Sequence, residues 1–287
     1  MTSSAYKVRE RVGLRTVQML RMSELLARNL TSSAKAVASG GPVVSLTSFG
    51  QRARTVAFTI ESIAAGELLP SRLILWLDEP ELLRAPPTML KRLMARGVEV
   101  LPTQNFGPHK KYFPYVQQTE SFDVPLVTAD DDVLYPKTWL SRLMARYVEH
   151  PGDVHCYRAR VVALSGSSFE PYSSWRECDK TSASHRHFSI GMAGVLLPPP
   201  VLRELKRSGE SFRESCPRTD DIWLNLHAQR VGARVRQVSD KPDYFMLLPG
   251  TQKVGLLHTN VGGGGGNDSA LRAVYSATDL ERLRQES

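Results

Sequence analysis

Residues 125–136 read Pro-Leu-Val-Thr-Ala-Asp-Asp-Asp-Val-Leu-Tyr-Pro, an apolar run that leads into three consecutive aspartates. Leu126 and Val127 predict a short buried strand, and Pro136 with the periodic run after it predicts the start of a helix. The acids therefore follow the carboxyl end of a strand. In an open α/β sheet, ligands bind at that edge.

The three aspartates, Asp130, Asp131 and Asp132, repel one another when they are ionised side by side. This repulsion raises their pKa values, so a buried cluster needs a cation to neutralise it. Oxygen ligands at alternate positions of an extended segment suit Mg²⁺ or Mn²⁺, which proteins usually hold with one or two carboxylates plus substrate phosphates. The alternative is a solvated acidic turn, but turns rarely follow so apolar a strand. The pattern favours a metal and phosphate site.

The charge of the chain is concentrated at its N-terminus. The 287 residues are 41% hydrophobic and 23% charged, which is ordinary for a globular protein, and they carry a net charge of +8. Residues 1–41 hold seven basic and two acidic residues, a net +5. A basic balance fits nucleic acid, nucleotide phosphates or an acidic membrane surface, and it does not choose among them.

Cysteine usage and hydropathy predict a cytoplasmic protein. Cys156, Cys178 and Cys216 are odd in number and form no C-x-x-C pair, which argues against a disulfide framework and for a reducing compartment. No apolar run approaches the ~18 residues of a membrane span, and the N-terminus lacks the apolar core of a secretory signal. Residues 5–30 predict a loosely amphipathic basic helix. It is expected to lie on an acidic bilayer, at the inner face of the membrane, to dock on a partner, or to pack on its own domain.

Strand and helix patterns alternate along most of the chain, which predicts a mostly parallel sheet flanked by helices, with right-handed crossovers. We expect residues 1–41 to form a helical extension and linker, and residues 42–287 to form a single α/β domain. Within that domain, strands are expected at residues 43–49, 73–77, 98–101 and 154–164, and helices at residues 54–66, 80–96 and 138–149.

Two loops carry features typical of binding sites. Lys111 lies among aromatic residues within the segment 105–114. Such a loop is suited to a nucleotide, because cations bind its phosphates and aromatic rings contact its base. Residues 188–198 predict a strand that contains Gly191 and Gly194, and glycine in a strand marks either the close approach of a ligand or a bulge.

Two later segments have both a structural and a functional interpretation. Asp220 and Asp221 open a predicted helix after Thr219, a good N-cap residue, and acids in this position stabilise a helix without any catalytic role. The glycine run at residues 262–266 indicates a hinge or a lid.

The chain resembles the GT-A nucleotide-sugar glycosyltransferases, and among them the bacterial family 2 enzymes. Four features occur in the order that this family has. The resemblance covers roughly residues 41–268. Its parts are a DxD-type motif at Asp130 to Asp132, a glycine loop at Gly191 to Gly194, an acidic motif at Asp220 and Asp221, and a late histidine, His258.

The resemblance implies a Rossmann-like GT-A fold and a metal-dependent hexosyltransferase. The expected donor is a nucleotide-diphosphate sugar, with UDP favoured, and the expected acceptor is a hydroxyl of a glycan or lipid-linked molecule, as in cell-surface polysaccharide biosynthesis. Nucleic acid is not an expected partner. Mn²⁺ or Mg²⁺ would be held by Asp130, Asp132 and His258, with Asp132 preferred as the direct ligand, and Asp130 would also contact the nucleotide.

The resemblance also assigns roles to the remaining residues. Asp221 matches the position of the family's general base, with Asp220 as the adjacent candidate. If either acid is that base, displacement inverts the anomeric centre. The family more often has Glu-Asp here, which leaves the choice between the two acids open. The donor contacts carried over are Asp131 at the ribose or diphosphate, Thr47, Ser48, Phe49 and Asp78 at the nucleoside, Lys111 at the uracil or diphosphate, and Gly191 and Gly194 at the sugars.

Two other classes of protein also fit parts of the sequence. Phosphohydrolases of the haloacid dehalogenase type place Asp-x-Asp at a strand end, but they favour a small turn directly after it, where this chain has Val133, Leu134 and Tyr135. A nucleic-acid-binding module is suggested by a pI of about 9.5. Against it, most of the excess charge lies on the N-terminal arm and three acids occupy the expected cleft.

Overall fold

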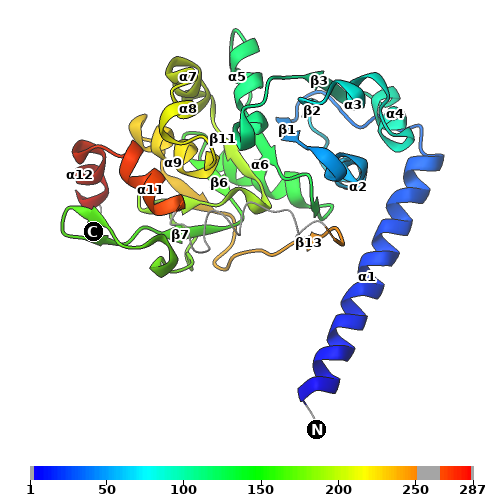
Figure 1. The fold of residues 1–287 in the computed structure, drawn as a ribbon, viewed down its shortest axis with the longest axis horizontal. Helices are drawn as coiled ribbons and strands as arrows, with labels where there is room; N and C mark the ends of the chain where they lie inside the picture. The colour runs from blue at the N-terminus through cyan, green and yellow to red at the C-terminus, as the bar shows by residue number, and fades with distance from the viewer. Residues whose placement is uncertain (1–2, 251–265, 286–287) are drawn as a thin grey trace.

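The protein is built around one seven-stranded sheet (Figure 1), and the computed structural model describes residues 3–250 and 266–285. The strand order is β12-β6-β11-β4-β1-β2-β3. Neighbouring strands are parallel except at β11, which runs antiparallel to both β4 and β6. The prediction of a mostly parallel α/β sheet is confirmed. The strands are β1 Val43–Thr47, β2 Arg72–Leu77, β3 Glu99–Pro102, β4 Leu126–Ala129, β6 Val154–Cys156, β11 Val195–Leu197 and β12 Val235–Gln237.

Helices cover both faces of the sheet. The α-helices are α1 Ser3–Thr31, α2 Val56–Ala64, α3 Pro80–Arg84, α4 Thr88–Ala95, α5 Phe113–Gln118, α6 Trp139–Glu149, α7 Pro199–Ser208, α8 Phe212–Ser215, α9 Asp220–Arg230, α11 Gly266–Val274 and α12 Ala277–Gln285. The 3₁₀ helices are η1 Gly50–Arg54, η2 Gly107–Lys111, η3 Tyr172–Ser174 and η4 Gly191–Ala193. Short strands outside the main sheet are β5 Val133–Leu134, β7 Ala159–Val161, β8 Leu164–Ser165, β9 Ser168–Phe169, β10 His187–Ser189 and β13 Met246–Leu247.

The central strands are apolar on both sides because each face packs against helices. Side chains of a strand point alternately to opposite faces. In β1, Val43 belongs to the core shared with α5, α7 and α9, whereas Val44 and Leu46 belong to the core shared with α2, α4 and α6. This double burial explains why the strands read as continuous apolar runs rather than as alternating patterns.

Three predicted elements are interrupted in the structure. The strand expected over residues 154–164 is divided into β6 and β7, and Leu164 begins β8. The helix expected over residues 80–96 is divided into α3 and α4, because Pro86 and Pro87 supply no backbone N–H for a continuous helix. The strand expected over residues 188–198 is divided into β10 and β11 by the short helix η4. Gly194 leaves η4 with φ of +95°, a backbone conformation that favours glycine.

The first helix, α1, projects away from the body of the molecule at its N-terminal end and lies against α2 and α4 at its C-terminal end (Figure 1). It is 29 residues long. Across the described parts of the chain, none of the helices has the length and apolar character needed to cross a bilayer.

Candidate active site

The carboxyl ends of three parallel strands bring the candidate residues together. Because β1 lies between β2 and β4, the residues that follow these strands share one edge of the sheet. Asp130, Asp131 and Asp132 follow β4, and two further acids, Asp220 and Asp221, begin α9. We call these five carboxylates the acidic edge.

Asp131 is buried at the centre of the acidic edge. Ser48 Oγ donates a hydrogen bond of 2.6 Å to Asp131 Oδ2, and Arg52 Nη2 lies 2.6 Å from Oδ1. Thr59 Oγ1 donates to the Asp131 backbone carbonyl at 2.7 Å. Burial raises the pKa of Asp131 to about 6, although Arg52 and Ser48 act in the opposite direction. The side chain is therefore held in place and is costly to ionise.

Arg52 is the main residue of this site that sequence reasoning missed. Its Nη2 contacts Asp131 Oδ1 and also lies 2.9 Å from Asp132 Oδ2, so one guanidinium group bridges two acids of the motif. It comes from η1, directly after β1, and its guanidinium carbon lies 5.7 Å from the centroid of the Phe49 ring. The sequence could have indicated this residue, because Arg52 and Arg54 follow the buried strand β1 closely. Residues that follow β1 lie at the same edge of the sheet as the acids that follow β4.

Lys111 joins the two groups of acids. Its ammonium forms an ion pair with Asp130 and lies 3.7 Å from Asp220 Oδ2. Burial alone would lower its pKa, but attraction to Asp130, Asp220 and Asp221 outweighs burial and raises the pKa well above its usual value. Lys111 is therefore a permanent cation between the β4 acids and α9.

Asp221 is held by a backbone group of η4. The Gly191 N–H donates a hydrogen bond of 3.0 Å to Asp221 Oδ1. Burial and then repulsion from Asp220 raise the pKa of Asp221 to about 7, against the opposing effects of Lys111 and the Gly191 N–H. A Cβ atom on residue 191 would lie only 2.7 Å from Asp221 Oδ1. Glycine at this position leaves room for the carboxylate.

Other predicted residues have partners inside the fold. Thr47 Oγ1 donates to the Trp76 carbonyl at 2.9 Å, and a Cβ on Gly194 would lie 2.7 Å from the Trp139 ring. Thr219 precedes α9 as expected but makes no side-chain cap, because its hydroxyl lies 2.9 Å from the thiol of Cys216.

The ends of β1 and β2, where the nucleoside contacts were predicted, contain one further ion pair. Asp78 is bound by the buried Lys110 at 2.6 Å, a partner that the sequence did not suggest. Phe49 is 40% exposed beside the acidic edge. Two predictions cannot be compared with the fold, since His258 and residues 262–265 of the glycine run lie outside the described residues.

Among the residues that the structure describes, the acids of the site outnumber the cations paired with them. Ion pairs join Arg52 and Lys111 to four of the five carboxylates of the acidic edge, and Lys111 also attracts the fifth, Asp221. Within residues 3–250 and 266–285, no group of three or more acidic, histidine or cysteine side chains is arranged to hold a metal by itself. Mg²⁺ and Mn²⁺ sites that bind nucleotides need only one or two protein carboxylates, because phosphates and water complete them. The donor set and the negative excess therefore fit such an ion.

Comparison with known proteins identifies the fold and no family. No protein-family profile and no curated protein matches the chain. The structure is similar to S. aureus TarS residues 1–349, with a TM-score of 0.51 and 14% identity over 85% of this chain and 70% of that one. This likeness, together with the sheet, confirms the predicted GT-A-like fold.

Two other solved structures are similar at lower TM-scores. The mannosyltransferase PcManGT from Pyrobaculum calidifontis, in complex with GDP-Man and Mn²⁺, is 11% identical, with a TM-score of 0.49 over 98% of this chain and 84% of that one. A CMP:2-keto-3-deoxy-manno-octonic acid synthetase complexed with CTP is 12% identical, with a TM-score of 0.42 over 71% of this chain and 89% of that one.

Proposed function

We propose that this protein transfers a sugar from a nucleoside-diphosphate donor to a hydroxyl group of an acceptor. The observation that carries the proposal is the acidic edge, where five carboxylates converge on two cations at the carboxyl ends of parallel strands. Ligands bind at this edge in open α/β sheets. A negative excess of this kind suits a divalent cation and the diphosphate that it accompanies.

The donor would bind across the ends of β1, β2 and β4. Asp130 and Asp132 would hold Mn²⁺ or Mg²⁺, with His258 as a further ligand, and the bound ion supplies Lewis-acid stabilisation of the leaving diphosphate. Lys111 and Arg52 add fixed positive charge for the same phosphates. Phe49 and Asp78 would contact the nucleoside, the first through its exposed ring. We propose uridine diphosphate-sugars as the first donors to test.

Asp221 is the proposed general base. It removes the proton of the acceptor hydroxyl as the acceptor oxygen bonds to the anomeric carbon and the bond from that carbon to the diphosphate breaks. The electron pair of the broken bond leaves with the diphosphate, and displacement from the opposite side inverts the anomeric centre. A base is most efficient when its pKa lies near the working pH, which agrees with a pKa of about 7. Asp220 would position Lys111 rather than take the proton.

The proposal is tested by measuring nucleoside diphosphate release from a panel of uridine and guanosine diphosphate-sugars. We expect one donor to be turned over in Mn²⁺ and the rate to fall when EDTA is added, because the leaving diphosphate then loses its counter-charge. Equal turnover with and without metal would contradict the proposed site. Phosphate release from p-nitrophenyl phosphate, without donor turnover, would favour the phosphohydrolase alternative.

A further inference from the structure

Helix α1 carries an unusual share of the exposed apolar surface. Among residues whose side chains are described, six of the eleven exposed large hydrophobic side chains lie on this helix. Two of them, Met19 and Leu20, are 69% and 66% exposed. The other four are Leu14, Val17, Leu26 and Leu30. Leu14, Val17 and Leu20 recur every three residues and therefore share one side of the helix, whereas Met19, Leu26 and Leu30 lie on another side. Exposed apolar side chains that share one side of a helix mark an interaction surface.

In Figure 1, none of the helices and strands that the structure describes lies beside the N-terminal half of α1. A helix of 29 residues is about 43 Å long, and the N-terminal part of this one extends beyond the body of the molecule. Most helices in proteins gain their stability from packing an apolar face, and isolated helices are marginal in water. The projecting half is therefore expected to have a partner.

Charge identifies the kind of partner. Residues 1–41 carry a net +5 in the sequence, and the exposed Arg15 lies beside Leu14, whereas Arg21 pairs with Glu24 and Arg28 pairs with Glu61. Pairing with a second copy of α1 would bring like charges together along the helix. Nucleic acid would attract the arginines but would leave the aliphatic side chains in water. An anionic lipid bilayer satisfies both groups.

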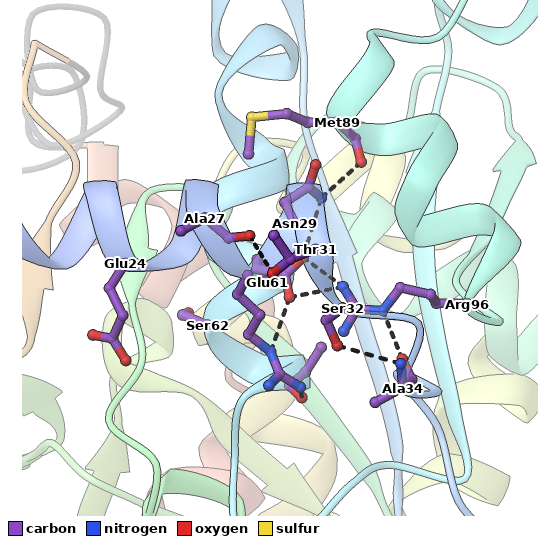
Figure 2. Close-up of polar contacts among 12 residues, drawn as sticks. Glu24, Ala27, Asn29, Thr31, Ser32, Ala34, Glu61, Ser62, Met89 and Arg96 are labelled. Carbon is purple, nitrogen blue, oxygen red and sulfur yellow. Dashed lines mark hydrogen bonds and ion pairs between the residues drawn. The ribbon is translucent and has the colours of Figure 1, made fainter.

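We propose that α1 binds the surface of an anionic bilayer and fixes the acidic edge beside it. A buried charge cluster anchors the C-terminal end of the helix to the domain (Figure 2). Asn29 Nδ2 donates to Glu61 Oε2 and to the Met89 carbonyl, each at 3.1 Å. Arg28 Nε lies 3.0 Å from Glu61 Oε1, and its Nη2 donates to the Ala64 carbonyl at 2.9 Å. The helix is thus bound to both α2 and α4.

A second attachment joins α1 to the wall of the site. Gln18 Nε2 donates to the Leu247 carbonyl at 3.1 Å, and Leu25 is buried in a cluster with Leu134 and Leu248. The Leu248 N–H in turn donates to the Asp132 carbonyl at 2.8 Å. On the proposed function, this connection presents the acidic edge to an acceptor carried by a membrane lipid.

The test is sedimentation of the full-length protein with phosphatidylcholine vesicles, with or without phosphatidylglycerol, in the absence of any nucleotide-sugar. We expect binding only when phosphatidylglycerol is present, and weaker binding at high salt. The double substitution Leu14→Gln and Leu20→Gln should lower partitioning about a hundredfold, because each leucine that enters the bilayer contributes about tenfold or more. Val148→Gln on α6, which replaces a side chain that is 74% exposed, is the matched control and should bind normally.

The inference would be overturned by the absence of vesicle binding, by binding that does not depend on phosphatidylglycerol, or by dimerisation that the leucine substitutions abolish. Salt-sensitive binding to DNA or RNA without vesicle binding would overturn it in favour of a nucleic acid partner. Donor turnover in solution is measured separately. Turnover without vesicle binding would refute only the membrane inference, and vesicle binding without turnover of any donor would refute only the proposed function.

Discussion

Replacing Asp221 with asparagine is expected to lower the rate of sugar transfer by a factor of about 10² to 10⁴, the usual contribution of a general base. The same substitution should raise the melting temperature at neutral pH. Burial and the neighbouring Asp220 raise the pKa of Asp221 to about 7 from a usual 3.8, so the folded protein resists its ionisation. Asparagine removes this charge and still accepts the Gly191 N–H.

The pH dependence of stability gives an independent measurement of the same group. Between the usual pKa of 3.8 and the folded value of about 7, the native state binds more protons at Asp221 than the unfolded chain does. This contribution to stability therefore falls as the pH rises through that window and is absent from Asp221→Asn. Transfer activity should rise with pH over the upper part of the window, because the base works when it is deprotonated.

Two companion variants separate Asp221 from its surroundings. Asp220→Asn should retain much more activity, since Asp220 acts through Lys111. Gly191→Ala places a Cβ 2.7 Å from Asp221 Oδ1 and should reduce turnover while leaving donor binding intact. Full activity in Asp221→Asn together with its loss in Asp220→Asn would assign the base to Asp220 instead.

Replacing Glu61 with alanine is expected to lower the free energy of unfolding by roughly 3–5 kcal/mol, as measured by urea denaturation. The Glu61 side chain is completely buried in α2, and Arg96 Nη1 lies 2.8 Å from both of its carboxylate oxygens. Without Glu61, the Arg96 side chain, which is only 5% exposed, would lose its counter-charge in the core. Arg28 and Asn29 of α1 would lose a partner in the same step.

Glu24→Ala provides the control for Glu61→Ala. Glu24 also pairs with an arginine, Arg21, at 2.6 Å, but its side chain is 56% exposed. Exposed ion pairs contribute about 0–1 kcal/mol, so this substitution should leave the unfolding midpoint almost unchanged. Equal effects from the two substitutions would show that Glu61 does not anchor α1 to the domain.

The sequence was most informative where the structure depends on residues that are close to one another in the chain. The apolar run before Asp130 predicted both a buried strand and acids at its carboxyl end, and β4 has this arrangement. Alternation of strands and helices predicted the sheet, because parallel strands need helical crossovers. The break in the predicted helix over residues 80–96 could also have been read from Pro86 and Pro87.

The interactions within the site depend on contacts that are distant in the chain. Arg52 reaches Asp131 from another strand end, and Gly191 reaches Asp221 from another layer. No local pattern records these distances. Glu61 has the same limitation, because a glutamate within a helix resembles an ordinary surface acid until the fold buries it. Composition identified α1 as a basic helix but could not show that the N-terminal part of this helix projects from the domain.

The central claim is that an activated sugar binds at the acidic edge together with a divalent ion, and a thermal-shift experiment tests it most directly. The protein and its Asp132→Ala variant are each heated with uridine and guanosine diphosphate-sugars, with and without Mn²⁺. We expect one donor to raise the melting temperature only when Mn²⁺ is present, and this shift to vanish in the variant, because ligand binding stabilises the native state in proportion to its occupancy. Equal stabilisation without metal, or an unchanged shift in Asp132→Ala, would contradict the account.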